Sequence, residues 1–291
     1  MKAFALTVGL TIAAMPLACR AQPAEGALVT KAGEIESRLG VRVGLAVYDT
    51  ERDTSWLYHA DDRFPLTSTF KAFACAALLH RVDDGQTALD RTVRISQSDL
   101  VPYAPVMEHL VGQEVSLQNA CAAALRLSDN VAGNKVLDSI GGPTGLTEYM
   151  RSIGDTVTRL DRREPELNEA TPGDRRDTTT PAAIAKSLRR LVLGDALSTL
   201  SRQQLTAWLL ADEVGGPLLR ASLPKEWRIA DRTGAGGHGS RGIVAVIWPP
   251  GQAPIVAAIF LTCTDATMDQ RNGSIAELGA ALVADVSKQN R

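Results

Sequence analysis

The sequence predicts an α/β (α+β) fold in which one sheet is built from both ends of the chain and helices lie between them. Strand-like patterns occur between residues 41 and 58 and return between residues 227 and 262. From Ser68 to about Leu210, apolar residues instead recur at helical spacing. Separate runs of strands and helices are typical of a sheet with segregated helices. We therefore expect a sheet domain made from the two termini, with an all-helical domain inserted.

The length and charge of the chain limit the number of domains and the kinds of binding partner. The chain has 291 residues and a formal net charge of −2. A chain of this length can bury a large core, either in one compact unit or in two interleaved domains. We place the sheet domain at residues 26–62 and 212–291, and the helical domain at residues 63–211. The scattered, mildly acidic charge gives no footprint for nucleic acid or for an anionic membrane.

The first residues are typical of an export signal. Met1-Lys2 supplies a basic start, and Ala3 to Ala18 forms an apolar stretch too short for a membrane span. Cleavage after Ala21 would remove residues 1–21 as a signal peptide. Lipid attachment at Cys19 is the alternative. We expect a periplasmic protein whose mature form does not contact the membrane unless it is lipidated at Cys19.

The predicted elements begin with an amphipathic helix at Ala27–Arg38. Residues Val41–Tyr48 then alternate as a strand, and Ser55–Tyr58 can pair with it as a hairpin. Capping hydroxyls, prolines or glycines that start helices occur at Ser68, Ser116, Gly141-Gly142-Pro143, Thr180-Pro181 and Ser201. The late elements are strands at Trp227–Thr233, Ile243–Trp248 and Ile255–Thr262, a turn at Pro249-Pro250-Gly251, and a helix at Ser274–Val286.

The turn Thr67-Ser68-Thr69-Phe70-Lys71 is the strongest candidate for chemistry. If a helix begins there, the Ser68 hydroxyl and the Lys71 amine lie on one face within reach of each other. A close amine can take the proton of a serine when its own charge is suppressed. The helix start would also stabilise an oxyanion. Taken alone, the pair is more typical of an ordinary capping serine with a solvated lysine.

Three further polar motifs follow. Ser128-Asp129-Asn130 ends an apolar helix, which by itself indicates only a cap. Arg232-Thr233-Gly234 and the glycine-rich residues after it end a strand, where a cation and a hydroxyl could hold a carboxylate. Glu164-Pro165-Glu166-Leu167-Asn168 lies in a long loop between two helices, and such loops are often functional.

The cysteines agree with export. Cys75 and Cys121 lie in two apolar helical patterns, whereas Cys263 lies in a strand-like run. In an oxidising compartment we predict a disulfide between Cys75 and Cys121, with Cys263 buried and free. Two buried free thiols are the alternative for the pair. No cysteine or histidine cluster has the spacing of metal ligands, and we expect no cofactor.

In their order and spacing, the four motifs resemble those of class A serine β-lactamases. The resemblance covers about Leu28 to Val286, and the stretches Leu160–Ala170 and Asp177–Pro181 are especially similar. It implies a β-lactamase or penicillin-binding transpeptidase-like fold, with an antiparallel sheet flanked by helices. It also implies a small-molecule β-lactam substrate, no nucleic-acid partner and a monomer.

The resemblance implies a role for each motif. Ser68 would attack the lactam carbonyl, and either Lys71 or Glu164 would act as its base. Ser128 would pass a proton to the departing nitrogen, and Glu164 with Asn168 would activate the water that frees the acyl group. The other implied site residues are the oxyanion-hole backbone of Ser68 and Ala235, the substrate contacts Tyr103, Asn130, Arg232, Thr233, Gly234, Gly236 and Arg241, and the loop pair Arg162 and Asp177.

Arg232 stands where most members of the family carry lysine. An Arg-Thr-Gly motif is similar to that of the carbenicillin-hydrolysing subgroup, and arginine offers a carboxylate a permanent, planar charge. We therefore expect hydrolysis of penicillins including carboxypenicillins, with some cephalosporins as further candidates, and hence antibiotic resistance. A D,D-peptidase and a β-lactam sensor are the alternatives. Glu164 argues against the peptidase, and the lack of a second hydrophobic span for a membrane tether argues against the sensor.

Overall fold

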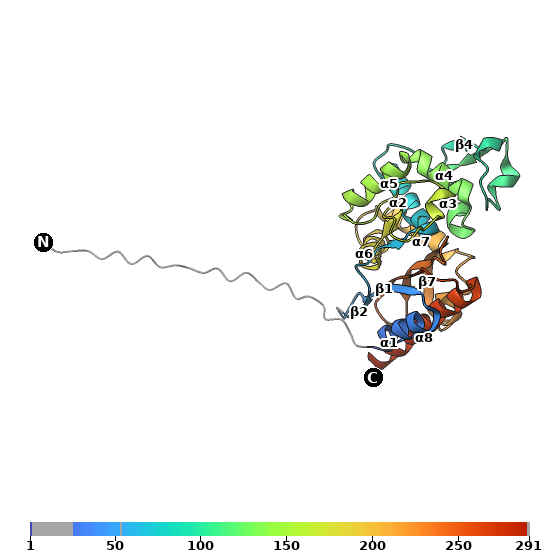
Figure 1. Ribbon diagram of the computed structural model, residues 1–291. Helices are drawn as coiled ribbons and strands as arrows, with labels where there is room; N and C mark the ends of the chain where they lie inside the picture. The colour runs from blue at the N-terminus through green and yellow to red at the C-terminus, as the bar shows by residue number, and fades with distance from the viewer. Residues whose placement is uncertain (2–25, 53, 290–291) are drawn as a thin grey trace.

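The computed structural model describes Met1 and residues 26–52 and 54–289 (Figure 1). The predicted signal peptide, its cleavage site at Ala21 and the alternative lipid site at Cys19 fall outside these residues. Within the part of the chain that is described, no helix is both long enough and apolar enough to span a membrane.

A five-stranded antiparallel sheet joins the two ends of the chain. Its strands run in the order β2-β1-β9-β8-β7. Their bounds are Arg42–Asp49 for β1, Ser55–Tyr58 for β2, Arg228–Ala235 for β7, Arg241–Trp248 for β8 and Ile255–Thr262 for β9. The strands β1 and β9 pair along their whole length, from Arg42 opposite Thr262 to Asp49 opposite Ile255. The predicted fold class, a sheet formed from both chain ends with helices between them, is confirmed.

One face of the sheet is covered by the first and last helices, α1 (Ala27–Leu39) and α8 (Met268–Gln289). They lie side by side on the side of the sheet away from the other helices (Figure 1). The first residue before α1 is a glycine and supplies no side-chain cap. Asp285 of α8 replaces it, because its carboxylate accepts the backbone N–H groups of Ala27 and Leu28 at 2.9 and 3.0 Å. These contacts and a shared apolar core fix the two helices on the sheet.

The other face of the sheet meets the helical part of the chain, which is organised around α2 (Phe70–Asp83). Every residue of α2 from Phe70 to Leu79 is buried, as expected for a helix that is surrounded by others. The neighbours that bury it are α3 (Leu117–Arg126), α4 (Asn130–Ser139), α5 (Gly142–Ser152) and α7 (Thr199–Leu210), while α6 (Pro181–Val192) packs on the sheet.

Short elements connect these layers. Two small antiparallel ladders join β3 (Phe64–Pro65) to β6 (Thr178–Thr179), and β4 (Thr92–Arg94) to β5 (Glu114–Ser116). Single 3₁₀ turns occupy η1 (Thr67–Thr69), η2 (Gln97–Asp99), η3 (Met107–Leu110), η4 (Glu166–Asn168) and η5 (Leu219–Ala221). The turn η1 follows the short strand β3 and runs directly into α2. The Ser68 motif therefore lies where the chain leaves β3 and enters the helical part.

Two helix starts differ from the prediction. Helix α7 begins at Thr199, not Ser201, because the cap is Ser198, whose hydroxyl accepts the Ser201 N–H at 3.2 Å. Helix α8 begins at Met268, well before the predicted Ser274. There Thr267 and Gln270 exchange side-chain and backbone hydrogen bonds as a capping box.

The disulfide between Cys75 and Cys121 is present and joins α2 to α3. The prediction that Cys263 is buried was wrong, because its side chain is exposed. Strand β9 ends at Thr262, and Cys263 follows with a positive φ of 58° that takes it out of the sheet.

Candidate active site

The candidate nucleophile lies at the entrance of α2. Ser68 is the middle residue of the 3₁₀ turn Thr67–Thr69, and α2 starts at Phe70. Lys71 follows one turn later, and its Nζ lies 3.0 Å from Ser68 Oγ. The predicted pair therefore forms, with the hydroxyl just before the first turn of a long buried helix. In that position it lies close to the free N–H groups and positive dipole of α2.

Lys71 is fully buried among oxygen atoms. Its Nζ lies 2.8 Å from the carbonyl oxygen of Ser128, 2.6 Å from Oδ1 of Asn130 and 3.1 Å from Oε1 of Glu164. Burial lowers the pKa of the amine to about 8, although the charge of Glu164 acts in the opposite direction. Near neutral pH a small fraction of the amine is therefore uncharged and able to accept a proton.

The triplet Ser128-Asp129-Asn130 starts α4, rather than only ending α3. Asp129 caps α4 by accepting the Ala132 N–H at 2.8 Å. Its second oxygen accepts the backbone N–H groups of Val106 and Met107, both at 2.9 Å. Asp129 thus ties the serine-bearing turn to the loop that carries Tyr103.

The Glu164 carboxylate lies within hydrogen-bond distance of both Ser68 and Lys71. Ser68 Oγ donates to Glu164 Oε1 at 3.1 Å, and Asn168 Nδ2 donates to Glu164 Oε2. The side-chain amide of Asn134 on α4 holds the backbone of Glu164 twice, because it accepts the N–H at 3.0 Å and donates to the carbonyl at 2.9 Å. The Glu164 carboxylate is thus fixed by α4 as well as by its own loop.

The loop is closed at its neck by Asp177, which is buried. Its Oδ1 accepts the N–H groups of Asp161 and Arg162, and its Oδ2 receives Arg162 Nε at 2.6 Å. The predicted pair of Arg162 and Asp177 is therefore formed. The Asp177 carbonyl also accepts the N–H of Leu66, so the neck is joined to the segment that leads into the nucleophile turn.

The edge strand β7 forms the opposite wall. A Cβ on Gly234 would lie 2.0 Å from Oγ1 of Thr67 and 2.9 Å from the backbone N of Ser68. Only glycine therefore allows β7 to approach the nucleophile turn this closely. The next residue, Ala235, lines the same cavity as Ser68.

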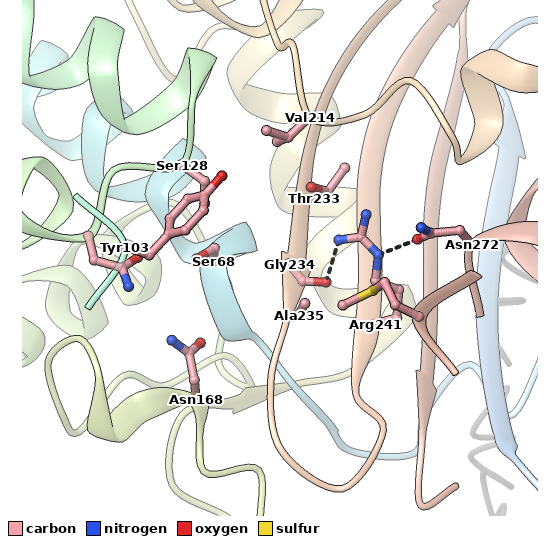
Figure 2. Close-up of a pocket in the computed structure, with 12 residues that line it drawn as sticks. Ser68, Tyr103, Ser128, Asn168, Val214, Thr233, Gly234, Ala235, Arg241 and Asn272 are labelled. Atoms are coloured by element: carbon pink, nitrogen blue, oxygen red, sulfur yellow. Dashed lines mark hydrogen bonds between the residues drawn. The ribbon is translucent and has the colours of Figure 1, made fainter. Parts of the chain in front are cut away.

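These walls enclose a cavity of about 370 Å³. The lining includes nine of the residues predicted from the sequence, which are Ser68, Tyr103, Ser128, Asn130, Asn168, Thr233, Gly234, Ala235 and Arg241. Figure 2 shows the two serines and Tyr103 on the helical side and Thr233, Gly234 and Arg241 on the strand side. Lys71 and Glu164 lie behind this lining.

The structure adds Val214, Met268 and Asn272 to the cavity wall. Asn272 accepts Arg241 Nε at 2.8 Å, and Arg241 Nη1 donates to the Gly234 carbonyl at 3.1 Å (Figure 2). Burial lowers the pKa of Arg241 to about 10, with a further contribution from the charge of Arg232. The capping box at Thr267 and Gln270 is the sequence signal that could have placed Met268 and Asn272 on a helix.

Two predicted substrate contacts do not line the cavity. Arg232 is fully buried, and its Nη1 forms an ion pair with Asp212 at 2.9 Å. Gly236 follows β7 and donates its N–H to Ser240 at 3.1 Å. Across residues 26–52 and 54–289, no group of three His, Cys, Asp or Glu side chains is placed to hold a metal ion.

A buried serine–lysine pair, a carboxylate within reach of both, and a walled cavity define a serine hydrolase that acts by acyl transfer. The family model of the β-lactamase enzyme family matches residues 28–286. The chain therefore belongs to that family.

Curated relatives and solved structures that are similar to this chain agree with that family assignment. The chain is 56% identical to β-lactamase AER-1 of Aeromonas hydrophila over 248 residues, which are 85% of this chain and 82% of that protein. It is 48% identical to β-lactamase PSE-4 of Pseudomonas aeruginosa over 257 residues, 88% of this chain and 89% of that protein. An ancestral class A β-lactamase structure matches with a TM-score of 0.87 and 53% identity, over 88% of this chain and 99% of that chain. The chain is thus a class A β-lactamase.

Proposed function

We propose that this enzyme opens the β-lactam ring of penicillins, including carboxypenicillins, through an acyl-enzyme on Ser68. Some cephalosporins are further candidate substrates. The observation that carries the proposal is the position of Ser68 Oγ, 3.0 Å from Lys71 Nζ and 3.1 Å from Glu164 Oε1. Hydrolysis of the drug would make the host resistant to it.

Acylation begins with removal of the Ser68 proton. Both candidate bases are within hydrogen-bond distance of Oγ, so the geometry supports Lys71 and Glu164 alike. The lowered pKa of Lys71 favours proton acceptance by the amine. As the carbonyl carbon becomes tetrahedral, the backbone N–H groups of Ser68 and Ala235 stabilise the oxyanion.

Ser128 then protonates the departing lactam nitrogen. Lys71 Nζ lies 3.4 Å from Ser128 Oγ and 3.0 Å from Ser68 Oγ, so the amine lies between the two hydroxyls. A proton taken from Ser68 can therefore reach Ser128 through Lys71. Cleavage of the C–N bond opens the ring and leaves the acyl group, with the protonated nitrogen still attached to it, on Ser68 Oγ.

Deacylation is assigned to Glu164 and Asn168. Glu164 is buried beside Ser68, where it can take a proton from a water that attacks the ester. Oδ1 of Asn168 is buried and, among the described residues, has no hydrogen-bond partner. It can therefore accept a hydrogen bond from that water while the Asn168 amide holds the Glu164 carboxylate.

Binding of the substrate carboxylate is assigned to Thr233 and Arg241 in the cavity wall, with the charge of Arg232 acting from behind them. Asn130 and Gly236 are assigned to the substrate's side-chain amide, and Tyr103, which is 57% exposed, to the rim of the cavity. We also propose that the protein is exported to the periplasm and acts there as a monomer.

The test is the fate of the acyl-enzyme in Glu164→Ala. We expect rapid acylation by benzylpenicillin, followed by accumulation of a covalent adduct that intact-protein mass spectrometry detects within seconds. Glu166→Ala is the matched control, because it removes an exposed carboxylate two residues further along the same loop. Turnover by Glu164→Ala equal to that of the wild type would contradict the assigned role.

If the protein were a D,D-peptidase or a β-lactam sensor, the wild-type protein itself would remain acylated by penicillin. Wild-type protein that carries penicillin stoichiometrically and releases no product would support one of them and overturn the hydrolase.

A further inference from the structure

A buried carboxylate outside the predicted site, Asp212, links two walls of the cavity. It follows α7, and its Oδ1 accepts the backbone N–H groups of Val214 and Gly215 at 2.6 and 2.7 Å. Val214 lines the cavity. Oδ2 of Asp212 receives Arg232 Nη1 at 2.9 Å, and the side chains of Asp212 and Arg232 are both shielded from solvent.

Arg232 in turn contacts the back of the nucleophile turn. Its Nε lies 3.3 Å from the carbonyl oxygen of Ser68, and its Nη1 also lies 3.3 Å from the carbonyl oxygen of Leu125. In the described part of the chain, its Nη2 is buried without a hydrogen-bond partner. Asp212 is thus the charged partner that orients a guanidinium located between the nucleophile and strand β7.

A second ion pair, between Arg220 and Asp231, lies near this one. Asp231 on β7 is buried and accepts Arg220 Nε at 2.8 Å. Gly215, which Asp212 holds, passes so close that a Cβ on it would lie 2.2 Å from Oδ2 of Asp231. Gly215 is therefore held by Asp212 and packs closely against Asp231.

We propose that Asp212 is a positioning residue for recognition of the substrate carboxylate. It acts by fixing the orientation of the Arg232 guanidinium and the position of Val214 in the cavity wall. The inference rests on the proposed function, because it concerns how the same cavity binds a penicillin. A guanidinium makes directional bonds in its plane, so its orientation matters as well as its charge. Asp212 touches neither the substrate nor the reacting atoms.

The experiment is a double-mutant cycle with Asp212→Asn and Arg232→Lys, measured with benzylpenicillin and carbenicillin. We expect Asp212→Asn alone to raise KM by about tenfold, with kcat changed less than about twofold, because Lys71 and Glu164 remain in place. In the Arg232→Lys background the same substitution should change KM by less than about twofold, because lysine lacks the planar fork that Asp212 orients.

Glu213→Gln is the matched control. It removes the carboxylate of the next residue, which is paired with Arg126 at the surface, and it should leave KM unchanged. Thermal unfolding of each variant checks that the protein is folded.

A KM for Asp212→Asn that stays within twofold of the wild type, or falls, would show that Asp212 only balances the charge of Arg232 and would overturn the inference. Equal effects in both backgrounds would do the same. Wild-type protein without β-lactam turnover would refute the proposed function instead, so the two failures are distinguishable.

Discussion

Among single residues, Asp231 has the clearest effect on how the stability of the protein depends on pH. Burial, together with the charge of Asp212, raises the pKa of this carboxyl to about 7. An unfolded aspartate titrates near 3.9. Between about pH 4 and pH 7 the folded protein therefore holds a proton that the unfolded chain has lost, and stability falls as the pH rises through this window.

We predict that Asp231→Asn removes this dependence, because an amide does not titrate. Urea unfolding at pH 5 and at pH 7.5 measures it. The wild type should lose stability between these two values, whereas the variant should not. The comparison concerns the change with pH, since loss of the Arg220 pair also lowers the stability of the variant at both values. An equal change of the free energy of unfolding between pH 5 and pH 7.5 in both proteins would contradict the raised pKa of Asp231.

The residues to which we assign the chemistry could be singled out in the sequence because each belongs to a short local motif. Ser68 and Lys71 lie on one helical turn, and Glu164 lies in a loop whose neighbours are themselves diagnostic. Asp212 was not predictable in this way. It becomes significant only because the end of α7 meets β7 in space, and no pattern near residue 212 indicates that contact. Met268 and Asn272 were missed because the start of α8 was placed too late.

Among the elements, the Glu164 loop depends on its neck. Asp177→Asn would weaken the bonds to the Arg162 side chain and to two backbone N–H groups, and would remove the buried one of the two carboxylates, Asp177 and Glu169, that pair most closely with the Arg162 guanidinium. We predict that deacylation slows by more than about tenfold while acylation changes little. Pre-steady-state mass spectrometry separates the two steps.

Asp174→Asn is the control for this prediction. Asp174 lies in the same loop and is 4.0 Å from the same arginine, but its main partner is the exposed Arg176. Surface pairs of this kind contribute little, so the control should deacylate at the wild-type rate. Equal slowing of both steps in Asp177→Asn would indicate general unfolding of the site rather than loss of the neck.

The elements themselves were largely predictable. Strands β2 and β9 were expected with the bounds that the structure has, because each is a clean apolar run between turns. Cys263 was misplaced for the opposite reason. Its hydrophobic neighbours on the N-terminal side indicate a strand, but a positive φ is a local backbone choice that composition does not reveal.

In the whole molecule, the two faces of the sheet have separate apolar cores. The core of α1 and α8 does not include α2 or α4, the helices that carry Lys71 and Asn130. Leu282, which is fully buried in it, lies ~15 Å further along α8 than Asn272. We predict that Leu282→Ala lowers the free energy of unfolding by ~2–5 kcal/mol, while kcat and KM of the folded enzyme stay unchanged.

Leu200→Ala removes the same atoms from a side chain that is 78% exposed, and it should alter stability by less than ~0.5 kcal/mol. Denaturant unfolding and steady-state kinetics on the two variants check both statements. A large change in KM for Leu282→Ala would show that the far core is coupled to the cavity.

The sequence pattern was sufficient for the layers of the molecule but not for the cavity between them. Segregated strands and helices predict a sheet with an inserted helical part, and the sheet confirms it. The strand order β2-β1-β9-β8-β7 places β7 at an edge, where Gly234 lets it approach Ser68. That juxtaposition depends on side chains from distant parts of the chain, so local patterns could not place it.

The way in which the Glu164 loop is held has a consequence for how this enzyme could evolve. Asn134 holds Glu164 from α4, whereas residues 171–173 further along the loop are exposed. Insertions or substitutions in that outer segment can therefore accumulate without displacing the Glu164 carboxylate. This part of the loop is free to vary while the step that we assign to Glu164 is kept.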